Sequence, residues 1–439
     1  MTYKYPLLAF AVALCLPPSA FAASSDPVSM SLETALLFSM NKNPEIGVSA
    51  AKLDQTQHAI DEARSSYYPQ VRSTIIAGRE YNDPTSTPSN DGGASNISSE
   101  FTLNVDQTLY DGDKTYEEVQ RRTHISNSAS LEKRQAYEKV IIDTTKAYMQ
   151  VYRFQNAKRE AEDYIGRLKK IKRKVDLMVM AGAEDQSKLK MAEARLEFAE
   201  SSLSSLKSSL DTAMITLENI TGPLPDFVAT KPTLQDLVAL DIDEFLKQSE
   251  QGNVDLMINH SDLQAIKHEL GSAESDFLPN VHLVVDYDET HNSGGEIGRD
   301  RAASAMVQVN YKIFDGFGRD ATKEKVESKQ DQAEFEKARL IRDVRNKVKQ
   351  AYNKVHALED EYAIVLAEMK TNGELQDLYL EQFQLGEGDI LNLIEGEERL
   401  YTSKARVYEI ESNITLNILQ LAKMCGLIDY GGVCPLCEE

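Results

Sequence analysis

The sequence predicts a mainly α-helical protein with transmembrane β-strands, built as two tandem repeats that each contain a β-hairpin and a long antiparallel coiled-coil hairpin. Three observations indicate this fold class. A pattern of residues occurs twice along the chain, four segments alternate apolar and polar residues, and two stretches of about 68 residues contain no proline. Each repeat would therefore combine a pair of strands with a helical rod.

Residues 1–22 have the features of a secretory signal peptide. A short apolar stretch precedes Ala20 and Ala22, whose small side chains are typical of a cleavage site. Cys15 does not indicate a lipid anchor, because Leu14 before it is too large for lipoprotein processing. We therefore expect export, with cleavage after Ala22.

The duplication appears as residues that recur at a nearly constant offset. Pro279 follows Pro69 by 210 positions, whereas Asp315 follows Asp111 by 204. The first helix of each repeat is expected to end at a proline, which is Pro69 in the first repeat and Pro279 in the second. The loss of six residues between Pro279 and Asp315 indicates a shorter loop in the second repeat.

Four segments alternate apolar and polar residues with the period of two that strands show. In the second segment, Phe101, Leu103 and Val105 are separated by Thr102 and Asn104. Turn-forming residues divide each pair of segments, so each repeat supplies one hairpin. The expected strands are 70–82 and 99–110 in the first repeat, and 280–289 and 303–314 in the second.

The expected strands have the length of membrane-spanning strands. A soluble sheet packed on helices is the common alternative, but these segments run for about 9 to 13 residues, as a tilted strand needs to cross a bilayer. Four strands are too few to close a barrel, and an open edge in lipid leaves backbone groups unpaired. If the strands enter a membrane, the protein must therefore form oligomers.

Two helical hairpins account for most of the remaining chain. The helices that precede Gly182 and Gly386 run for about 68 residues and would form rods of about 100 Å, after which the chain turns and a second helix runs back. The returning helices carry small and apolar residues at steps of three and four, which indicates coiled-coil packing over 113–221 and 317–425. In the first repeat these residues are Leu189, Ala192, Leu196, Ala199, Leu203, Leu206, Leu210, Ala213, Leu217 and Ile220.

These elements divide the chain into five parts. The expected parts are a signal peptide at 1–22, a first repeat at 23–222, a connecting equatorial segment at 223–252, a second repeat at 253–426 and a C-terminal tail at 427–439.

Composition excludes several classes of protein. With 48 basic and 70 acidic residues the net charge is −22, which disfavours binding to nucleic acid or to anionic lipid headgroups. Beyond the N-terminus, no run approaches the roughly 20 apolar residues of a membrane helix, which excludes a helical transporter. The seven histidines lack the spacing of metal ligands, and no catalytic constellation is apparent, so we expect neither enzyme activity nor a cofactor.

Export places the remaining cysteines in an oxidising compartment. Cys434 and Cys437 have the spacing of redox dithiols, but no helix follows them to lower a thiol pKa. We expect a local disulfide between them, and a redox enzyme is the least favoured function. Cys425 is the odd third cysteine of this region.

The duplicated order of these features resembles the TolC family of outer-membrane channel proteins. The resemblance covers nearly the whole mature chain and rests on Asn43-Pro44-Glu45-Ile46, Pro69, Tyr110-Asp111-Gly112, Gly386, Leu393 and Gly426. It implies a homotrimer in the lipid of the bacterial outer membrane, with a twelve-stranded β-barrel continued by a periplasmic α-helical barrel. It also implies a periplasmic adaptor and an inner-membrane ABC transporter or other pump as partners.

The resemblance implies a gate where the helical hairpins turn. The candidate gate residues are Phe383, Asp389, Asn392 and Glu395 of the second repeat and Lys188, which we expect to face Asp389 from the first. Glu395 matches one acidic position of the family, whereas Asn392 replaces the other. Phe383 replaces a latch tyrosine and Gly388 replaces an arginine, so we expect Asp389 to supply the missing charge. Simple solvated turn residues, with Asp389 near a helix start, are the alternative.

The same turns are the expected docking sites for the adaptor. The residues concerned are Gly182, Asp185 and Gln186 in the first turn and Gly386 and Gly388 in the second. The first turn is similar to that of family members paired with type I secretion, which favours a large adhesin or toxin as cargo. Drug or metal efflux is the alternative, and a periplasmic coiled-coil tether without a pore is a second alternative.

Overall fold

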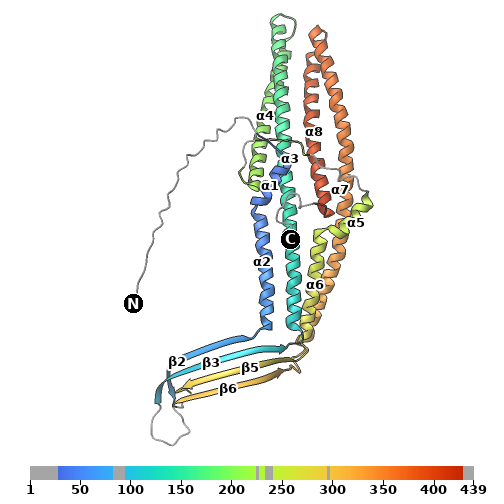
Figure 1. Cartoon of the computed structure of the whole chain (residues 1–439). Coiled ribbons are helices and arrows are strands. Elements are labelled where there is room, and N and C mark those ends of the chain that lie inside the picture. Colours follow the sequence, from blue (N-terminus) through green and yellow to red (C-terminus); the bar gives the residue numbers. More distant parts are fainter. Residues whose placement is uncertain (1–27, 83–93, 224–226, 233–240, 294–296, 429–439) are drawn as a thin grey trace, which may run out of the picture.

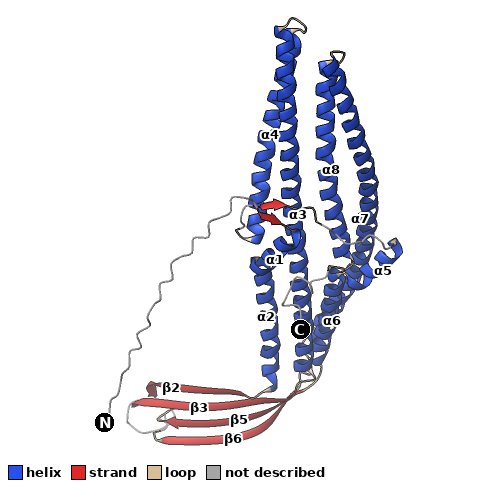
Figure 2. Ribbon diagram, turned by 45° about the horizontal axis from the view of Figure 1, so that its top comes forward, coloured by secondary structure: helices blue, strands red, loops and turns tan. Residues whose placement is uncertain are grey.

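The computed structural model describes residues 28–82, 94–223, 227–232, 241–293 and 297–428. The expected signal peptide and the pair Cys434 and Cys437 lie outside these residues. Within the described ranges, no helix is both long enough and apolar enough to span a bilayer. Figures 1 and 2 show a β-sheet at one end of the molecule and long helices that run from it to the tips.

Both repeats contain the same five main elements in the same order. The first comprises α2 (Pro44–Arg64), β2 (Gln70–Asn82), β3 (Ala94–Tyr110), α3 (Lys114–Met180) and α4 (Gln186–Thr221). The second comprises α6 (Val254–Ser275), β5 (Asn280–His291), β6 (Arg299–Asn310), α7 (Gly318–Leu385) and α8 (Ile390–Met424). The shorter elements are β1 (Val28–Met30), α1 (Leu32–Lys42), η1 (Ser65–Tyr67), β4 (Phe227–Ala229) and α5 (Ile242–Gly252).

The four long strands form one antiparallel sheet in the order β2-β3-β5-β6, so the two hairpins join through β3 and β5. The register places Val105 beside Val285 and Val285 beside Ala305, which gathers apolar residues on one face. The opposite face is polar, and there Asn104 donates a hydrogen bond to Asp286 at 2.7 Å. β2 and β6 are the edge strands of the described sheet.

Strand pairing moves the strand boundaries away from the expected ones. β6 ends at Asn310 rather than at 314, because Asn310 pairs with Asn280, the first residue of β5, and the described chain offers no strand beyond it. β6 also starts earlier than expected, at Arg299, opposite the end of β5. β3 starts at Ala94 rather than at 99, because it pairs with Asn82 at the end of β2.

The helices of the two repeats lie side by side along their whole length. Towards the tips, α3 packs against α4, α7 packs against α8, and α3 also contacts α8 (Figure 1). Towards the sheet, α2 packs on α3, and α6 packs on both α3 and α7. The long helix α3 therefore contacts both repeats at every level and joins them into one unit.

Apolar side chains between the helices hold this arrangement together. Near the tips, Leu168 and Val175 of α3 are buried with Leu393 and Ile394 of α8. Each such side chain contributes roughly 1.5 to 3 kcal/mol when fully buried. Halfway along, the small parallel sheet of β1 and β4 lies on α3, where the hydroxyl of Tyr148 donates to the backbone carbonyls of residues 30 and 230.

Candidate functional site at the tips of the helical hairpins

Each hairpin turns at a glycine in the left-handed conformation. Gly182 has φ 74° and Gly386 has φ 82°, values that favour glycine because it lacks a Cβ. After each glycine, a backbone N–H donates to a carbonyl in the last turn of the preceding helix. The expected docking residues Gly182, Asp185, Gln186 and Gly386 are all exposed at these turns.

Gly388 has a different role from the two turn glycines. Its N–H donates to the carbonyl of Gln382 at 3.0 Å, so the chain folds back onto the end of α7. A Cβ at this position would lie 2.7 Å from the backbone nitrogen of Phe383. The turn therefore cannot accept the arginine of the family pattern without changing shape.

The side chain of Phe383 joins the two repeats through Lys174 of α3. Phe383 is buried with 3% of its surface exposed, and the Lys174 ammonium lies 4.4 Å from the centre of its ring. The same ammonium lies 3.4 Å from the Phe383 carbonyl oxygen, to which it donates a hydrogen bond. A cation over an aromatic face is worth about 0.5 to 2 kcal/mol, so this contact fastens α7 to α3 without the tyrosine hydroxyl.

Lys188 and Asp389 also connect the repeats. The Lys188 ammonium lies 3.6 Å from Asp389 Oδ1 and 3.0 Å from Glu184 Oε2. Its hydrogen bond with Glu184 raises the pKa of the Lys188 ammonium. Asp389 is at the same time the N-cap of α8, where its carboxylate accepts from the Leu391 N–H at 3.2 Å. One carboxylate thus caps a helix and faces the other hairpin.

Glu395 and Asn392 lie apart from these contacts. Glu395 Oε2 lies 3.7 Å from Arg399 NH2, one turn further along α8. Asn392 is exposed. Of the candidate gate residues, the structure brings Lys188 and Asp389 together and buries Phe383, but it does not place Glu395 in contact with either member of the pair.

Sequence reasoning missed a series of ion pairs between α3 or α4 and α8. Glu397 is buried with 4% exposed and pairs with Arg167 of α3. The other pairs are Glu160 with Lys404 at 3.1 Å, Arg195 with Glu398 at 3.0 Å and Arg153 with Glu409 at 3.0 Å. The only available signal was the excess of basic residues at 167–174 and of acidic residues at 395–398, which suits facing helices.

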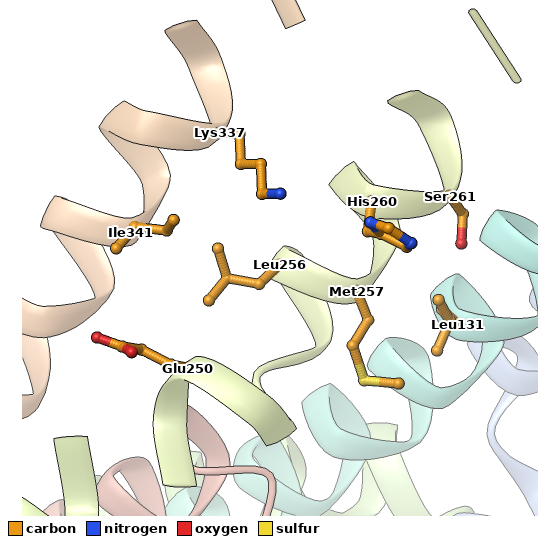
Figure 3. A pocket seen from close by; sticks show the side chains of 8 residues that line it. All are labelled: Leu131, Glu250, Leu256, Met257, His260, Ser261, Lys337 and Ile341. Carbon is orange, nitrogen blue, oxygen red and sulfur yellow. The ribbon is translucent and has the colours of Figure 1, made fainter. Parts of the chain in front are cut away.

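A hollow lies far from the tips, between α3, α5, α6 and α7 (Figure 3). Its volume is about 460 Å³, and Leu256, Met257 and Ile341 contribute apolar side chains to its lining. Glu250, Lys337 and His260 also line it. In the described part of the chain, no three His, Cys, Asp or Glu side chains are placed to hold a metal ion.

Comparison with known proteins identifies the chain. A family profile described as outer membrane efflux protein matches residues 39–223 and 245–427, that is, both repeats. The chain belongs to the outer membrane efflux protein family. This confirms the channel family expected from the sequence, and an efflux-family protein is an outer-membrane channel component rather than an enzyme.

Solved channel structures share the fold of this efflux-family chain. CusC matches with a TM-score of 0.79 and 14% identity, over 91% of this chain and 93% of CusC. CmeC of Campylobacter jejuni matches with a TM-score of 0.79 and 14% identity, over 96% and 94% of the two chains. VceC of Vibrio cholerae matches with 0.75 and 14%, over 90% and 96%. No curated protein matches the sequence.

Proposed function

We propose that three copies of this chain form an exit duct through the bacterial outer membrane. The observation that carries the proposal is the sheet, whose apolar face is open: Ile75 is 75% exposed and Val307 is 63% exposed. In lipid, the free edges of β2 and β6 would leave backbone groups unpaired, at a high cost in free energy. Pairing β6 of one copy with β2 of the next removes both edges, and three copies supply twelve strands for a barrel.

The helices support the same assembly, because the second repeat lacks a neighbour that the first repeat has. Ile364 and Leu378 of α7 are 68% and 55% exposed. They lie 204 positions after Glu160 and Lys174, which contact the second repeat from α3. Placing α4 of the next copy against α7 would cover Ile364 and Leu378 and repeat the contact of α3 with α8.

The tips lie at the opposite end of the molecule from the sheet, so a duct of this shape would point its tips into the periplasm (Figure 1). A periplasmic adaptor would bind the exposed turns at Gly182, Asp185 and Gln186 and at Gly386 and Gly388. The adaptor would connect the duct to an inner-membrane ABC transporter or another pump, which supplies the energy for export.

Purified protein tests the duct directly. We expect native mass spectrometry of the detergent-solubilised protein to give three chains, and we expect the same sample to conduct ions in a planar bilayer. A stable single chain without conductance would refute the duct and favour the periplasmic tether.

The cargo is the finer part of the proposal. The likeness of the first turn to type I secretion members supports a large secreted protein, whereas the family description supports a small effluxed solute. Deletion of the gene separates the two. Loss of one protein from the culture medium at unchanged drug and metal tolerance supports secretion, and lowered tolerance at an unchanged set of secreted proteins supports efflux.

A further inference from the structure

One exposed stripe of α3 near the tip carries positive charge followed by large apolar residues. Its members follow one another at steps of three and four and are Gly166, Lys170, Arg173, Leu177 and Met180. Leu177 is 61% exposed and Met180 is 75% exposed. Leu177 and Met180 are three residues apart on the helix surface and therefore form one small exposed apolar patch beside the turn.

The two cations of this stripe are available for a partner. Their basic neighbours are engaged: Lys169 lies 2.9 Å from Glu200, and Lys172 lies 3.3 Å from Glu193. Lys170 and Arg173 form no hydrogen bond or ion pair with the described residues. In a chain with a net charge of −22, this leaves a local positive surface.

The second repeat carries the opposite charge at the equivalent positions of α7. Those positions, 204 residues later, are Lys370, Glu374, Asp377, Glu381 and Gln384, and all are exposed. Glu374 and Asp377 thus stand where the first repeat has Lys170 and Arg173. A partner selected by charge at one stripe would be repelled at the other.

The α3 stripe lies on a face that subunit contacts leave open. Both flanks of α3 are occupied within one chain, by α4 and by α8. Tyr152 lies three heptads before Arg173 on this face, and its hydroxyl donates to Glu411, which also binds Lys231 from the segment after β4. Residues 230–232 of that segment therefore lie across α3 and α8 on this face. In the proposed duct this is the outer face, because chain lying across the helices on the inner face would obstruct the passage.

We propose that the α3 stripe is the main adaptor-binding surface and selects a helix with an acidic and apolar face, because a straight stripe along one helix matches the side of another. Carboxylates of the partner would face Lys170 and Arg173, and apolar side chains would cover Leu177 and Met180. The α7 stripe would not bind the same helix. The proposal rests on the proposed duct, and it makes the two repeats unequal docking sites.

Site-specific photocrosslinking in the native bacterium tests the proposal. A benzophenone amino acid is placed at Leu177 or at the equivalent Glu381, and the crosslinked segment is sequenced by mass spectrometry. We expect a helical segment rich in Asp, Glu and apolar residues to be captured from position 177. Equal capture of that segment from position 381, or capture of a basic segment from 177, would overturn the proposal.

Charge reversal then measures the contribution of the stripe, with the captured partner produced as a purified protein. We expect the pair Lys170→Glu and Arg173→Glu to weaken binding at least about tenfold at low salt, and the matched pair Glu374→Lys and Asp377→Lys to change it less than about twofold. Equal effects of the two pairs would overturn the proposal.

Mass and conductance of each variant separate the two proposals. Trimers that conduct but bind the partner equally well after reversal at Lys170 and Arg173 would leave the duct intact and refute the stripe. Loss of the trimer on reversal would also refute it, because the stripe would then belong to a subunit contact. A wild-type protein that neither trimerises nor conducts would refute the duct itself.

Discussion

The buried thiol of Cys425 shows how one residue reports on the middle of the molecule. Cys425 is 2% exposed, and its Sγ lies 3.5 Å from the carbonyl oxygen of Phe245 in α5. Burial raises the pKa of the Cys425 thiol to about 11. Because the thiolate is the reactive form, packing of α5 against the end of α8 should make this cysteine inert.

We therefore expect Cys425 to react slowly with a thiol reagent at pH 8 in the folded protein. In a Cys434→Ser and Cys437→Ser background, its labelling should be at least about 100-fold slower in buffer than in guanidinium chloride, since two pKa units remove that much thiolate. The labelling rate should rise with pH up to about 11. Labelling at the same rate in both solvents would contradict the burial of this thiol by α5.

At the tips, sequence reasoning located the turn residues and one pair between them, but not the contact of Lys174 with Phe383. The pair Lys188 and Asp389 was expected because both residues lie close to turns that Gly182 and Gly386 mark in the sequence. Lys174 and Phe383 are 209 residues apart, and nothing along either helix tells which cation reaches the ring. Glu395 was expected at the gate from its match to a family position, yet Arg399 on its own helix is its ion-pair partner.

At the scale of the elements, alternation predicted the two faces of the sheet correctly, whereas pairing decided where strands end. Val307 lies on the apolar face with Leu283, and Gln308 lies on the polar face with His282. These faces follow from the period of two within each strand. The end of β6 at Asn310 depends on the start of β5, which pairs with it. Because the alternation within β6 does not contain this information, the predicted end of the strand lay too far along the chain.

The two faces can be separated by a pair of adjacent substitutions in β6. We expect Val307→Lys to reduce the amount of assembled protein in the outer membrane strongly, because a lysine facing the bilayer midplane costs about 2 to 4 kcal/mol. Gln308→Lys is the matched control on the polar face and should assemble normally. The measurement is the yield of trimer extracted from purified outer membranes. Equal yields would show that the apolar face does not contact lipid.

At the scale of the whole molecule, the duplication in the sequence predicted the architecture but not the differences in surface chemistry between the two repeats. The offset of 204 correctly placed two helical hairpins with turns at Gly182 and Gly386. Within one chain, ion pairs join α3 and α4 of the first repeat to α8 of the second. The equivalent flank of α7 instead exposes the apolar residues Ile364 and Leu378. In the proposed trimer, six similar hairpins would therefore meet through two chemically different seams.

Those seams converge at the tips, where the proposed gate can be measured. Asp389 and Glu395 would each occur three times around the axis of the trimer, and like charges held close together attract multivalent cations and resist closure unless paired. Lys188 supplies that pairing for Asp389. We expect the double variant Asp389→Ala and Glu395→Ala to change single-channel conductance and to weaken block by multivalent cations applied from the periplasmic side.

The matched control is Glu387→Ala, which removes an exposed acidic side chain from the same turn and should leave both quantities unchanged. If the double variant conducts and is blocked like the wild type, the acidic residues are only solvated turn residues.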